Sequence, residues 1–291
     1  KRVALIEQNE RMYGGTCINI GCIPTKSLIM AAESNSTFEQ AMEHKDTVVS
    51  RLRQKNAKAL TSSGAVLYNG KGSFLSNKRV QVEAGNDRIV LEGETIVINT
   101  GAVSNQFPIP GLADSRHVVD STAILSLKEQ PKRLAIIGGG NIGLEFASLY
   151  AKLGSQVVVY EAAPAILGRY EPTVAQLAKS YLEEDGVTFH LSASVEEISN
   201  DEADQVLVKA NGETKAFDVL LYAMGRKPAT EKLGLEHTDI DITERGAIKV
   251  NDYCQTSVDG VYAVGDVTGG PQFTYTSLDD FRIVFGQLTG N

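Results

Sequence analysis

Two cysteines, Cys17 and Cys22, lie five residues apart in the segment GGTCINIGCIPTK, residues 14–26. Thiols at this spacing can form a disulfide, and electrons enter or leave such a pair when a thiolate attacks the disulfide. Gly21 lets the backbone approach a bulky group between the two thiols. Pro24 favours the first turn of a helix, which would place Cys22 at a helix N-terminus, where the helix dipole favours a thiolate. We therefore predict a redox-active dithiol.

A zinc site or a purely structural role would fit these cysteines less well. A structural zinc site normally needs four Cys or His ligands in two closely spaced pairs, whereas the third cysteine of this chain, Cys254, stands alone. Two unrelated buried cysteines would leave the glycines and Pro24 unexplained, although free cysteine packs as a small hydrophobic residue. We expect no metal site, and we expect Cys254, in a polar strand over residues 249–256, to be structural.

Three glycines, Gly138, Gly140 and Gly143, follow a short apolar run at GxGxxG spacing. The run, residues 134–137, is typical of a central parallel strand, and an amphipathic helix is predicted after the glycines. A GxGxxG alone is often an ordinary tight turn. This one lies between a strand and a helix and is followed by a second strand at residues 156–160, so it indicates a dinucleotide-binding site.

Two acids accompany these glycines. Glu161 follows the second strand, where an acid can hold the ribose diol of NAD. It would repel a 2′-phosphate, and Arg169 is the nearest arginine after it, so we expect NADH to be preferred over NADPH. Glu145 lies two residues after Gly143, in the early part of the helix. A carboxylate there is stabilised by the helix dipole and needs no function.

The composition excludes several classes of function. The chain has 291 residues, 42% of them hydrophobic and 22% charged, which is enough for two domains with their own cores. A net charge of −8 argues against a nucleic-acid partner. No apolar stretch approaches the ~20 residues that a membrane span requires. The cysteine pair and the absence of a signal peptide favour a cytoplasmic protein.

Other segments must position these residues. A helix is predicted from Thr37, with Gln40 completing a capping box and a basic run at residues 51–58 facing solvent. Residues 66–97 alternate short apolar runs with turns, which predicts a small antiparallel sheet.

Three apolar strands run into glycine turns. They read IVINTGA (residues 96–102), LLYAMGRKP (220–228) and TSVDGVYAVGD (256–266). Short buried strands of this kind often precede a close approach of the backbone to a ligand. Asp266, after the third strand, would by itself be an ordinary turn or cap residue.

The segment GGTCINIGCIPTK resembles the active-site segment of the class I pyridine nucleotide-disulfide oxidoreductases, which include lipoamide dehydrogenase, glutathione reductase and mercuric reductase. The resemblance implies an FAD cofactor, held in part by Gly14, Gly15 and Thr16. It also implies that Cys17 exchanges with the substrate and that Cys22 lies against the flavin as the charge-transfer thiolate.

The same resemblance implies further FAD-binding residues. Glu7 looks like the acid that holds the adenosine ribose, and Gly72 matches the backbone that contacts the adenine. Asp266 looks like the aspartate that binds the ribityl chain. Gly101 matches the first of the family's two crossovers between domains, although Asn99 stands where alanine is common.

On the nicotinamide side, Gly225 matches the second crossover. In the family an acid at the position of Glu145 pairs with a lysine at the position of Lys26, close to the flavin and the nicotinamide. We therefore hypothesise an ion pair between Lys26 and Glu145 that bridges the two domains.

The order of these segments predicts an α/β fold with two nested Rossmann-like domains and small added antiparallel sheets. An FAD-binding domain comprises residues 1–114 and 246–291, and an NAD-binding domain, residues 115–245, is inserted into it. The chain opens directly in a strand, so the first strand and GxGxxG of the FAD domain are expected to be missing. The interface domain through which the family forms homodimers is also expected to be missing, and the fragment alone to be inactive. No family acid–base motif contains any of the four histidines, His44, His117, His190 and His237.

The electron acceptor separates the remaining hypotheses. Residues 265–284 differ from the lipoamide dehydrogenase pattern and resemble the mercuric-reductase-like subgroup that includes the reactive-chlorine-resistance flavoprotein. We expect electrons to pass from NADH through FAD to a Cys17–Cys22 disulfide and on to a metal ion or a small disulfide. A dihydrolipoamide dehydrogenase is the second hypothesis. A non-enzymatic NAD-binding thiol redox sensor is the alternative from another class.

Overall fold

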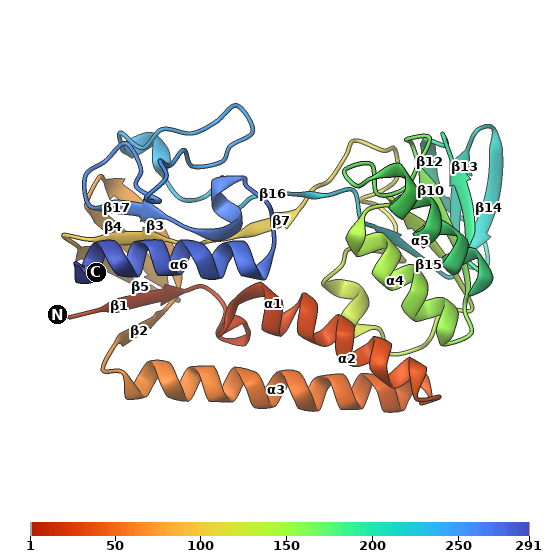
Figure 1. Cartoon of the computed structure of the whole chain (residues 1–291), viewed down its shortest axis with the longest axis horizontal. Helices are drawn as coiled ribbons and strands as arrows, with labels where there is room; N and C mark the ends of the chain where they lie inside the picture. The colour runs from red at the N-terminus through yellow and green to blue at the C-terminus, as the bar shows by residue number, and fades with distance from the viewer. Residues whose placement is uncertain (1, 291) are drawn as a thin grey trace. The chain divides into compact units, whose positions relative to one another are not determined.

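The structure, a computed structural model, describes residues 2–290, which form two compact units. Unit 1 contains the residues up to 17, residues 52–103 and the residues from 226 onward, and unit 2 contains residues 18–51 and 104–225 (Figure 1). These units are defined by their internal contacts. Their boundaries at residues 103 and 225 precede the domain boundaries expected at 114 and 245, and the nucleotide that each unit binds stays a prediction.

The centre of unit 2 is a five-stranded parallel sheet with the strand order β11-β10-β9-β15-β8. Helix α4 joins β9 to β10 and α5 joins β10 to β11, as parallel neighbours require. The strand, helix and second strand predicted around the glycines are thereby confirmed. The elements are α2 (Cys22–Glu33), the first half of α3 (Phe38–Ser62), β8 (Val118–Val119), η2 (Ala123–Ser126), β9 (Arg133–Ile137), α4 (Asn141–Lys152), β10 (Gln156–Glu161), α5 (Pro172–Glu184), β11 (Thr188–Leu191), β12 (Val195–Asn200), β13 (Val206–Ala210), β14 (Glu213–Phe217) and β15 (Val219–Tyr222).

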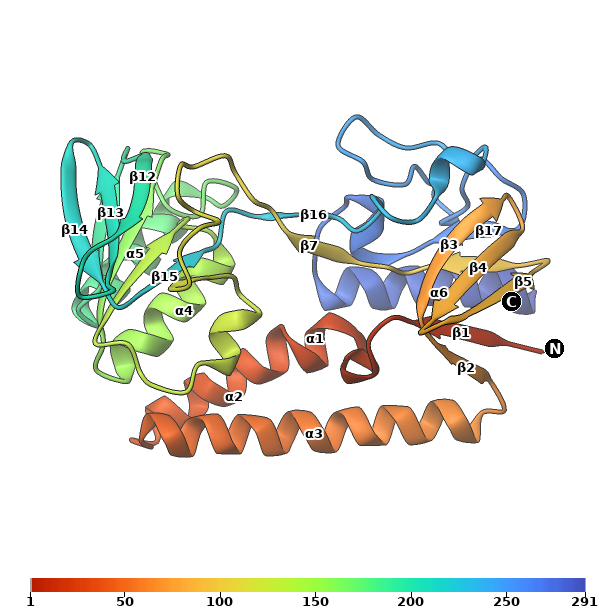
Figure 2. The ribbon, with the colours of Figure 1, turned by 180° about the vertical axis from the view of Figure 1, so that it is seen from behind.

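After Arg133, strand β9 is apolar from Leu134 to Ile137 because both of its faces are covered. Leu134 and Ile136 pack into a core with residues of α2, α3, α4 and α5. The alternate residues, Ala135 and Ile137, pack against the antiparallel sheet β12-β13-β14 on the other face (Figure 2). The glycine turn at the end of β9 therefore stands on a strand that is fixed from two sides.

The predicted capping box opens helix α3. The Thr37 N–H donates to Gln40 Oε1 at 3.0 Å, and the Gln40 N–H donates to Thr37 Oγ1 at 3.3 Å. The helix also buries the charged side chain of Lys45. Its ammonium group donates to the carbonyl of Leu125, which shows why this lysine can be buried.

Unit 1 contains two pairs of parallel strands, β1-β2 and β6-β17, and a three-stranded antiparallel sheet, β3-β4-β5. The prediction of a single antiparallel sheet over residues 66–97 is therefore wrong for the first and the last strand of this range, β2 and β6. Strand β2 returns through the long helix α3 to lie parallel to β1, and β6 pairs with a strand far along the sequence. The elements are β1 (Ala4–Glu7), η1 (Glu10–Met12), β2 (Val66–Asn69), β3 (Lys71–Ser76), β4 (Arg79–Ala84), β5 (Asp87–Glu92), β6 (Ile96–Ile98), β7 (Ala102–Ser104), β16 (Arg226–Pro228), η3 (Leu235–His237), β17 (Val261–Ala263), η4 (Gly265–Thr268) and α6 (Thr274–Thr289).

The core of unit 1 gathers around β17, where Val261 and Ala263 are fully buried. A second small cluster joins Tyr262 and Val264 to Cys254 and to Val284 of α6. Between residues 2 and 290, no helix combines the length and the apolar character needed to cross a membrane.

Candidate functional site

The dithiol segment has the local structure that the sequence predicts. Cys17 lies on the short helix α1 (Gly15–Asn19), and Cys22 is the first residue of α2. The Thr25 N–H and Oγ1 both donate to the carbonyl of Gly21, at 3.2 and 2.8 Å, and fix this helix start. Both cysteines are partly exposed, so reagents can reach them. Cys17 belongs to unit 1 and Cys22 to unit 2, and their disulfide stays a prediction.

Two ion pairs join α2 to α4 within unit 2. Lys26 Nζ lies 2.7 Å from Glu145 Oε1 near the beginnings of the helices, and Lys152 Nζ lies 2.9 Å from Glu33 Oε1 at their ends. In each pair, the two residues are 119 positions apart in the sequence. Helices α2 and α4 therefore run parallel and in register. The hypothesised Lys26–Glu145 pair forms, and both residues lie in unit 2; that the pair bridges an FAD-binding and an NAD-binding domain stays a prediction.

This register places the two helix N-termini on the same side of unit 2. Cys22 begins α2 and Asn141 begins α4, so the thiol and the glycine loop lie at corresponding ends. The Lys26 and Glu145 side chains are 57% and 42% exposed, and exposed ion pairs typically contribute only about 0–1 kcal/mol to stability. The pair therefore adds little to folding, which leaves room for a role in function.

The three glycines of the loop are needed for different reasons. Gly138 has a φ of +110°, and a Cβ atom on it would lie 2.5 Å from the carbonyl oxygen of Ala223. A Cβ on Gly143 would lie 2.1 Å from the carbonyl oxygen of Gly138. Gly140 is different, because a Cβ there would meet no heavy atom of the described chain within 4 Å. The fold requires Gly138 and Gly143, whereas Gly140 leaves open space at the α4 N-terminus, the end of a helix that favours anions; binding of a pyrophosphate there stays a prediction.

Glu161 lies directly beside this loop. Its two carboxylate oxygens accept hydrogen bonds from the backbone N–H groups of Gly139, at 2.6 Å, and Ala163, at 2.8 Å. Each oxygen keeps a second lone pair for a ribose hydroxyl. The following segment returns to the loop, since the Leu167 N–H donates to the Gly139 carbonyl at 2.9 Å. Arg169 is exposed two residues further on, and the preference for NADH stays a prediction.

In unit 1, Glu7 and Gly72 each serve the local structure. Glu7 ends β1, and its carboxylate accepts a hydrogen bond from the Asn9 N–H at 3.0 Å. A Cβ atom on Gly72 would lie 3.2 Å from Ile6 Cγ2, so the packing of β3 on β1 favours a glycine there. The FAD contacts assigned to both residues stay predictions.

Asp266 lies in η4, half-buried, directly after Gly265. Burial raises the pKa of its carboxyl group, and the nearby charge of Arg226 acts in the opposite direction. The Arg226 guanidinium also donates to the carbonyl of Ala102, so it ties together the crossover strands β16 and β7. Arg226 is a residue that the sequence motifs did not single out, although it directly follows Gly225 in GRKP.

The crossover glycines leave open space around them. Gly101 and Gly225 have φ values of +72° and +93°, and a Cβ on either would meet nothing within 4 Å among residues 2–290. Asn99, two residues before Gly101, faces Gly265, because its Oδ1 would lie 3.2 Å from a Cβ at that position.

Two residues near Asp266 differ from what the sequence predicts. Cys254 lies in a turn with a φ of +59°, not in the predicted polar strand, because it is enclosed by the buried cluster around Tyr262. It is 5% exposed, as a structural cysteine would be. Asp280, which no sequence motif singled out, accepts a hydrogen bond from the Gly265 N–H at 2.7 Å.

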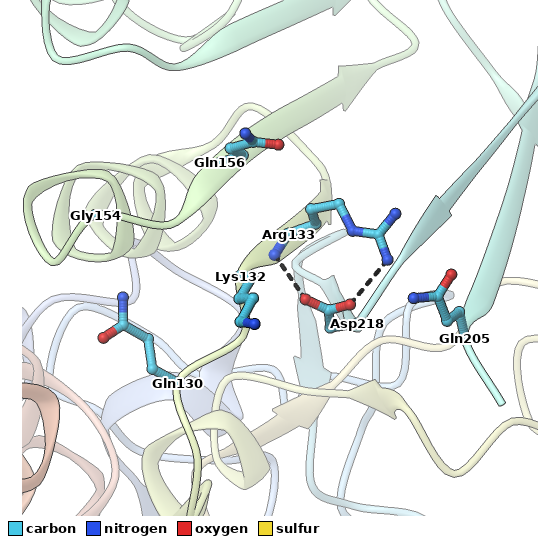
Figure 3. A pocket seen from close by; sticks show the side chains of 7 residues that line it. All are labelled: Gln130, Lys132, Arg133, Gly154, Gln156, Gln205 and Asp218. Carbon is cyan, nitrogen blue, oxygen red and sulfur yellow. Dashed lines mark hydrogen bonds and ion pairs between the residues drawn. The ribbon is translucent and has the colours of Figure 1, made fainter. Parts of the chain in front are cut away.

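A hollow of about 790 Å³ lies at the amino ends of β9, β10 and β15, at the edge of the sheet opposite the glycine loop (Figure 3). Asp218 accepts hydrogen bonds there from the backbone N–H of Arg133, at 2.8 Å, and from its guanidinium, at 3.0 Å. Burial alone would raise the pKa of Asp218, but these bonds and the arginine charge lower it overall. The pair stabilises the start of β9, and the hollow contains none of the predicted site residues.

Comparisons with known proteins agree with this architecture. The sequence model of the family described as "Pyridine nucleotide-disulphide oxidoreductase" matches residues 1–280. The probable pyridine nucleotide-disulfide oxidoreductase RclA of Escherichia coli K12 is 46% identical over 290 residues, which cover 99% of this chain and 66% of RclA. A solved structure described as the "Cu(II) complex of HOCl-induced flavoprotein disulfide reductase RclA" matches with a TM-score of 0.96 at 46% identity, covering 99% of this chain and 65% of that one.

Relatives of lower sequence identity carry names that specify a substrate. A dihydrolipoyl dehydrogenase of Chlamydia muridarum is 35% identical over 308 residues, which cover 100% of this chain and 65% of the relative. A mercuric reductase of Staphylococcus aureus is 32% identical over 310 residues, which cover 99% and 55%. The chain thus spans between 55% and 66% of the length of these relatives.

Proposed function

Because this chain belongs to the pyridine nucleotide-disulphide oxidoreductase family, we propose that the complete protein passes electrons from NADH through FAD to a Cys17–Cys22 disulfide and on to a metal ion or a small disulfide. The observation that carries the proposal is the parallel register of α2 and α4. It places Cys22 and the glycine loop at corresponding ends of two helices that the Lys26–Glu145 pair joins. A thiol and the proposed nucleotide-binding loop on one side of one unit support transfer of electrons from the nucleotide to the thiol.

The nicotinamide nucleotide is proposed to bind unit 2. Gly140 leaves the space for its pyrophosphate, with Gly138 and Gly143 shaping the loop, and Glu161 is proposed to hold the ribose diol. Glu145 and Gly225 complete the proposed contacts. The acid at Glu161 supports NADH over NADPH.

FAD is proposed to bind the residues of unit 1 together with Lys26. The open space at Gly101 and the positive φ values of Gly14 and Gly15, +96° and +77°, fit close approach of a flat cofactor to the backbone. FAD, when bound, supplies the two-electron chemistry between nicotinamide and thiols. The other residues proposed to hold it are Glu7, Thr16, Gly72 and Asp266.

The finer architecture is also a proposal. We place the FAD-binding domain at residues 1–114 and 246–291 and the NAD-binding domain at 115–245, as nested Rossmann-like folds. The chain covers 66% and 65% of two relatives, and for the unmatched part of the complete protein we propose a further strand with a GxGxxG and an interface domain. A homodimer formed through that domain and a cytoplasmic location complete the proposal.

A metal ion is the first acceptor to test. The solved RclA structure is described as a Cu(II) complex, and mercuric reductase is named for a metal ion. Thiolates bind soft metal ions well, and the partly exposed Cys17 is proposed to receive the metal. The two electrons of one dithiol would reduce two Cu(II) ions to Cu(I) or one small disulfide to two thiols. Lipoamide is the alternative substrate, supported by the identity to dihydrolipoyl dehydrogenase.

The test is an absorption spectrum of the complete gene product before and after one equivalent of NADH under argon. We expect a yellow protein that gains a broad long-wavelength band, lost in C22S. NADH oxidation is then compared with Cu(II), Hg(II), glutathione disulfide and lipoamide as acceptors. Fastest turnover with lipoamide would replace the metal proposal. A colourless protein that binds NADH and changes its thiols once, without turnover, would favour the redox-sensor alternative.

A further inference from the structure

The loop that carries Asp266 turns at Gly265. Its φ of +71° lies in the left-handed region, and a Cβ there would lie 3.2 Å from both Asn99 Oδ1 and Ser277 Oγ. The turn therefore requires a glycine for its backbone angle and for its space. Because Asp266 is the next residue, this turn sets the position of its backbone.

Asp280 fixes the turn from helix α6. Its Oδ2 accepts the Gly265 N–H at 2.7 Å, and Gly265 itself is buried. A buried N–H without a partner would cost free energy, and a carboxylate acceptor makes a short, charge-assisted hydrogen bond. Asp280 lies on the inner face of α6, one turn before the buried Val284. Its backbone is thus held by the packing of the helix.

Cys254 lies near Asp280 and packs against helix α6. The Ala263 N–H donates to the Cys254 carbonyl and the Cys254 N–H donates to the Asn251 carbonyl, both at 3.0 Å, so β17 and the turn fix the residue. Burial, followed by the negative charge of the nearby Asp280, raises the pKa of Cys254 to about 11. At neutral pH the thiol is therefore protonated and can donate to the carboxylate.

We propose that Asp280 is a positioning residue for the cofactor: through the Gly265 N–H it sets the orientation in which Asp266 binds FAD, and Cys254 steadies Asp280. This inference rests on the FAD-binding role proposed for Asp266. Gly265, Cys254 and Asp280 come from three separate segments; the Asp280 carboxylate accepts the Gly265 N–H, and Cys254 packs with Val284 of the same helix as Asp280. No contact between Asp280 and the cofactor is needed.

A double-mutant cycle tests the proposal. The dissociation constant for FAD is measured by flavin fluorescence on the flavin-depleted complete gene product, for wild type, D280A, D266N and the double variant. We expect D280A to bind FAD about tenfold more weakly, which corresponds to about 1.4 kcal/mol. D279A is the matched control, because Asp279 is an exposed carboxylate on the same turn of α6, and it should bind within about twofold of wild type.

The cycle separates positioning from general destabilisation. If Asp280 acts through Asp266, the double variant binds FAD no more weakly than D266N, because coupled residues are not additive. Additive losses, or equal affinities of D280A and D279A, would overturn the inference. D280N keeps an oxygen acceptor for the Gly265 N–H and should stay within about threefold of wild type; a loss as large as that of D280A would contradict the role of this bond.

A measurement on the wild type guards against a variant that does not fold. The amide hydrogen of Gly265 should exchange slowly with solvent, with or without FAD, because Asp280 holds it. Rapid exchange would overturn the inference. Failure of the wild type to bind FAD would overturn the proposed function and this inference with it, whereas normal wild-type binding with an unaffected D280A overturns the inference alone.

Discussion

The glycine loop of unit 2 and the Asp266 loop of unit 1 both follow a buried parallel strand, but they are held in different ways. In unit 2, backbone meets backbone: Cβ atoms on Gly138 and Gly143 would lie 2.5 and 2.1 Å from carbonyl oxygens. In unit 1, side chains from distant segments surround Gly265, with Asp280 on its N–H and Asn99 and Ser277 around its Cα. A local sequence pattern, the GxGxxG spacing, marks the first kind of support, whereas no local pattern marks the second.

The largest loss of stability is expected in the glycine loop, where an added side chain would collide with backbone atoms. In Gly143→Ala the new methyl group would collide with the Gly138 carbonyl oxygen, so α4 must move away from β9. We expect the variant to lose about 3 kcal/mol of the free energy of unfolding, at the upper end of overpacking costs. Urea unfolding checks this loss. A midpoint equal to that of the wild type would show that the loop adapts and is less rigid than its backbone contacts indicate.

Gly140→Ala should separate folding from binding in the same loop. Gly140 has a φ of −86° and open space around its Cα among residues 2–290, so alanine should change the free energy of unfolding by no more than about 1 kcal/mol. The methyl group would occupy the space proposed for the pyrophosphate, and we expect the affinity for NADH to fall about tenfold or more. Calorimetric titration with NADH measures this. An unchanged affinity would remove Gly140 from the site.

The same contrast between the loops shows what the sequence could predict. The strand, glycines, helix and second strand of unit 2 are confirmed because their signals are local: an apolar run of strand length, glycines at fixed spacing and a helical period. The start of α2 at Cys22 and the capping box of Thr37 and Gln40 are local signals of the same kind. Such features need no knowledge of distant partners.

Features that depend on distant segments were missed or misplaced. The sequence pattern groups β2 and β6 with the antiparallel sheet, because the alternation of apolar residues does not identify the strand with which each one pairs. Cys254 was placed in a strand, although contacts with Tyr262 and the helix α6 hold it in a turn. Asp280 carries no motif at all, since only the fold brings it to Gly265.

Lys26→Met tests the Lys26–Glu145 ion pair, a contact between residues far apart in the sequence that was predicted correctly. The variant removes the pair with Glu145, and K152M is a matched control, because it removes the second ion pair between the same two helices. Each should change stability by less than about 1 kcal/mol. We expect K26M alone to alter the flavin spectrum and to slow reduction by NADH about tenfold, measured by stopped-flow absorbance. Equal rates in K26M and K152M would assign the Lys26 pair to structure only.

Cys254→Ser should have the smallest effect, because serine keeps a donor toward Asp280. Redox behaviour should not change, and loss of the long-wavelength band in the reduced variant would contradict this.

The pKa of Cys254 is about 11 in the folded chain, above its ordinary value of 9.0, so the protonated thiol stabilises the fold. That contribution is complete below about pH 9 and is lost as the pH rises toward about 11. The free energy of unfolding of the wild type should therefore fall more steeply over this range than that of C254S, and urea unfolding at several pH values measures both slopes. Parallel slopes would show that neither burial nor the charge of Asp280 raises the pKa of the thiol, and the side-chain support of the Asp266 loop would then depend on Asp280 alone.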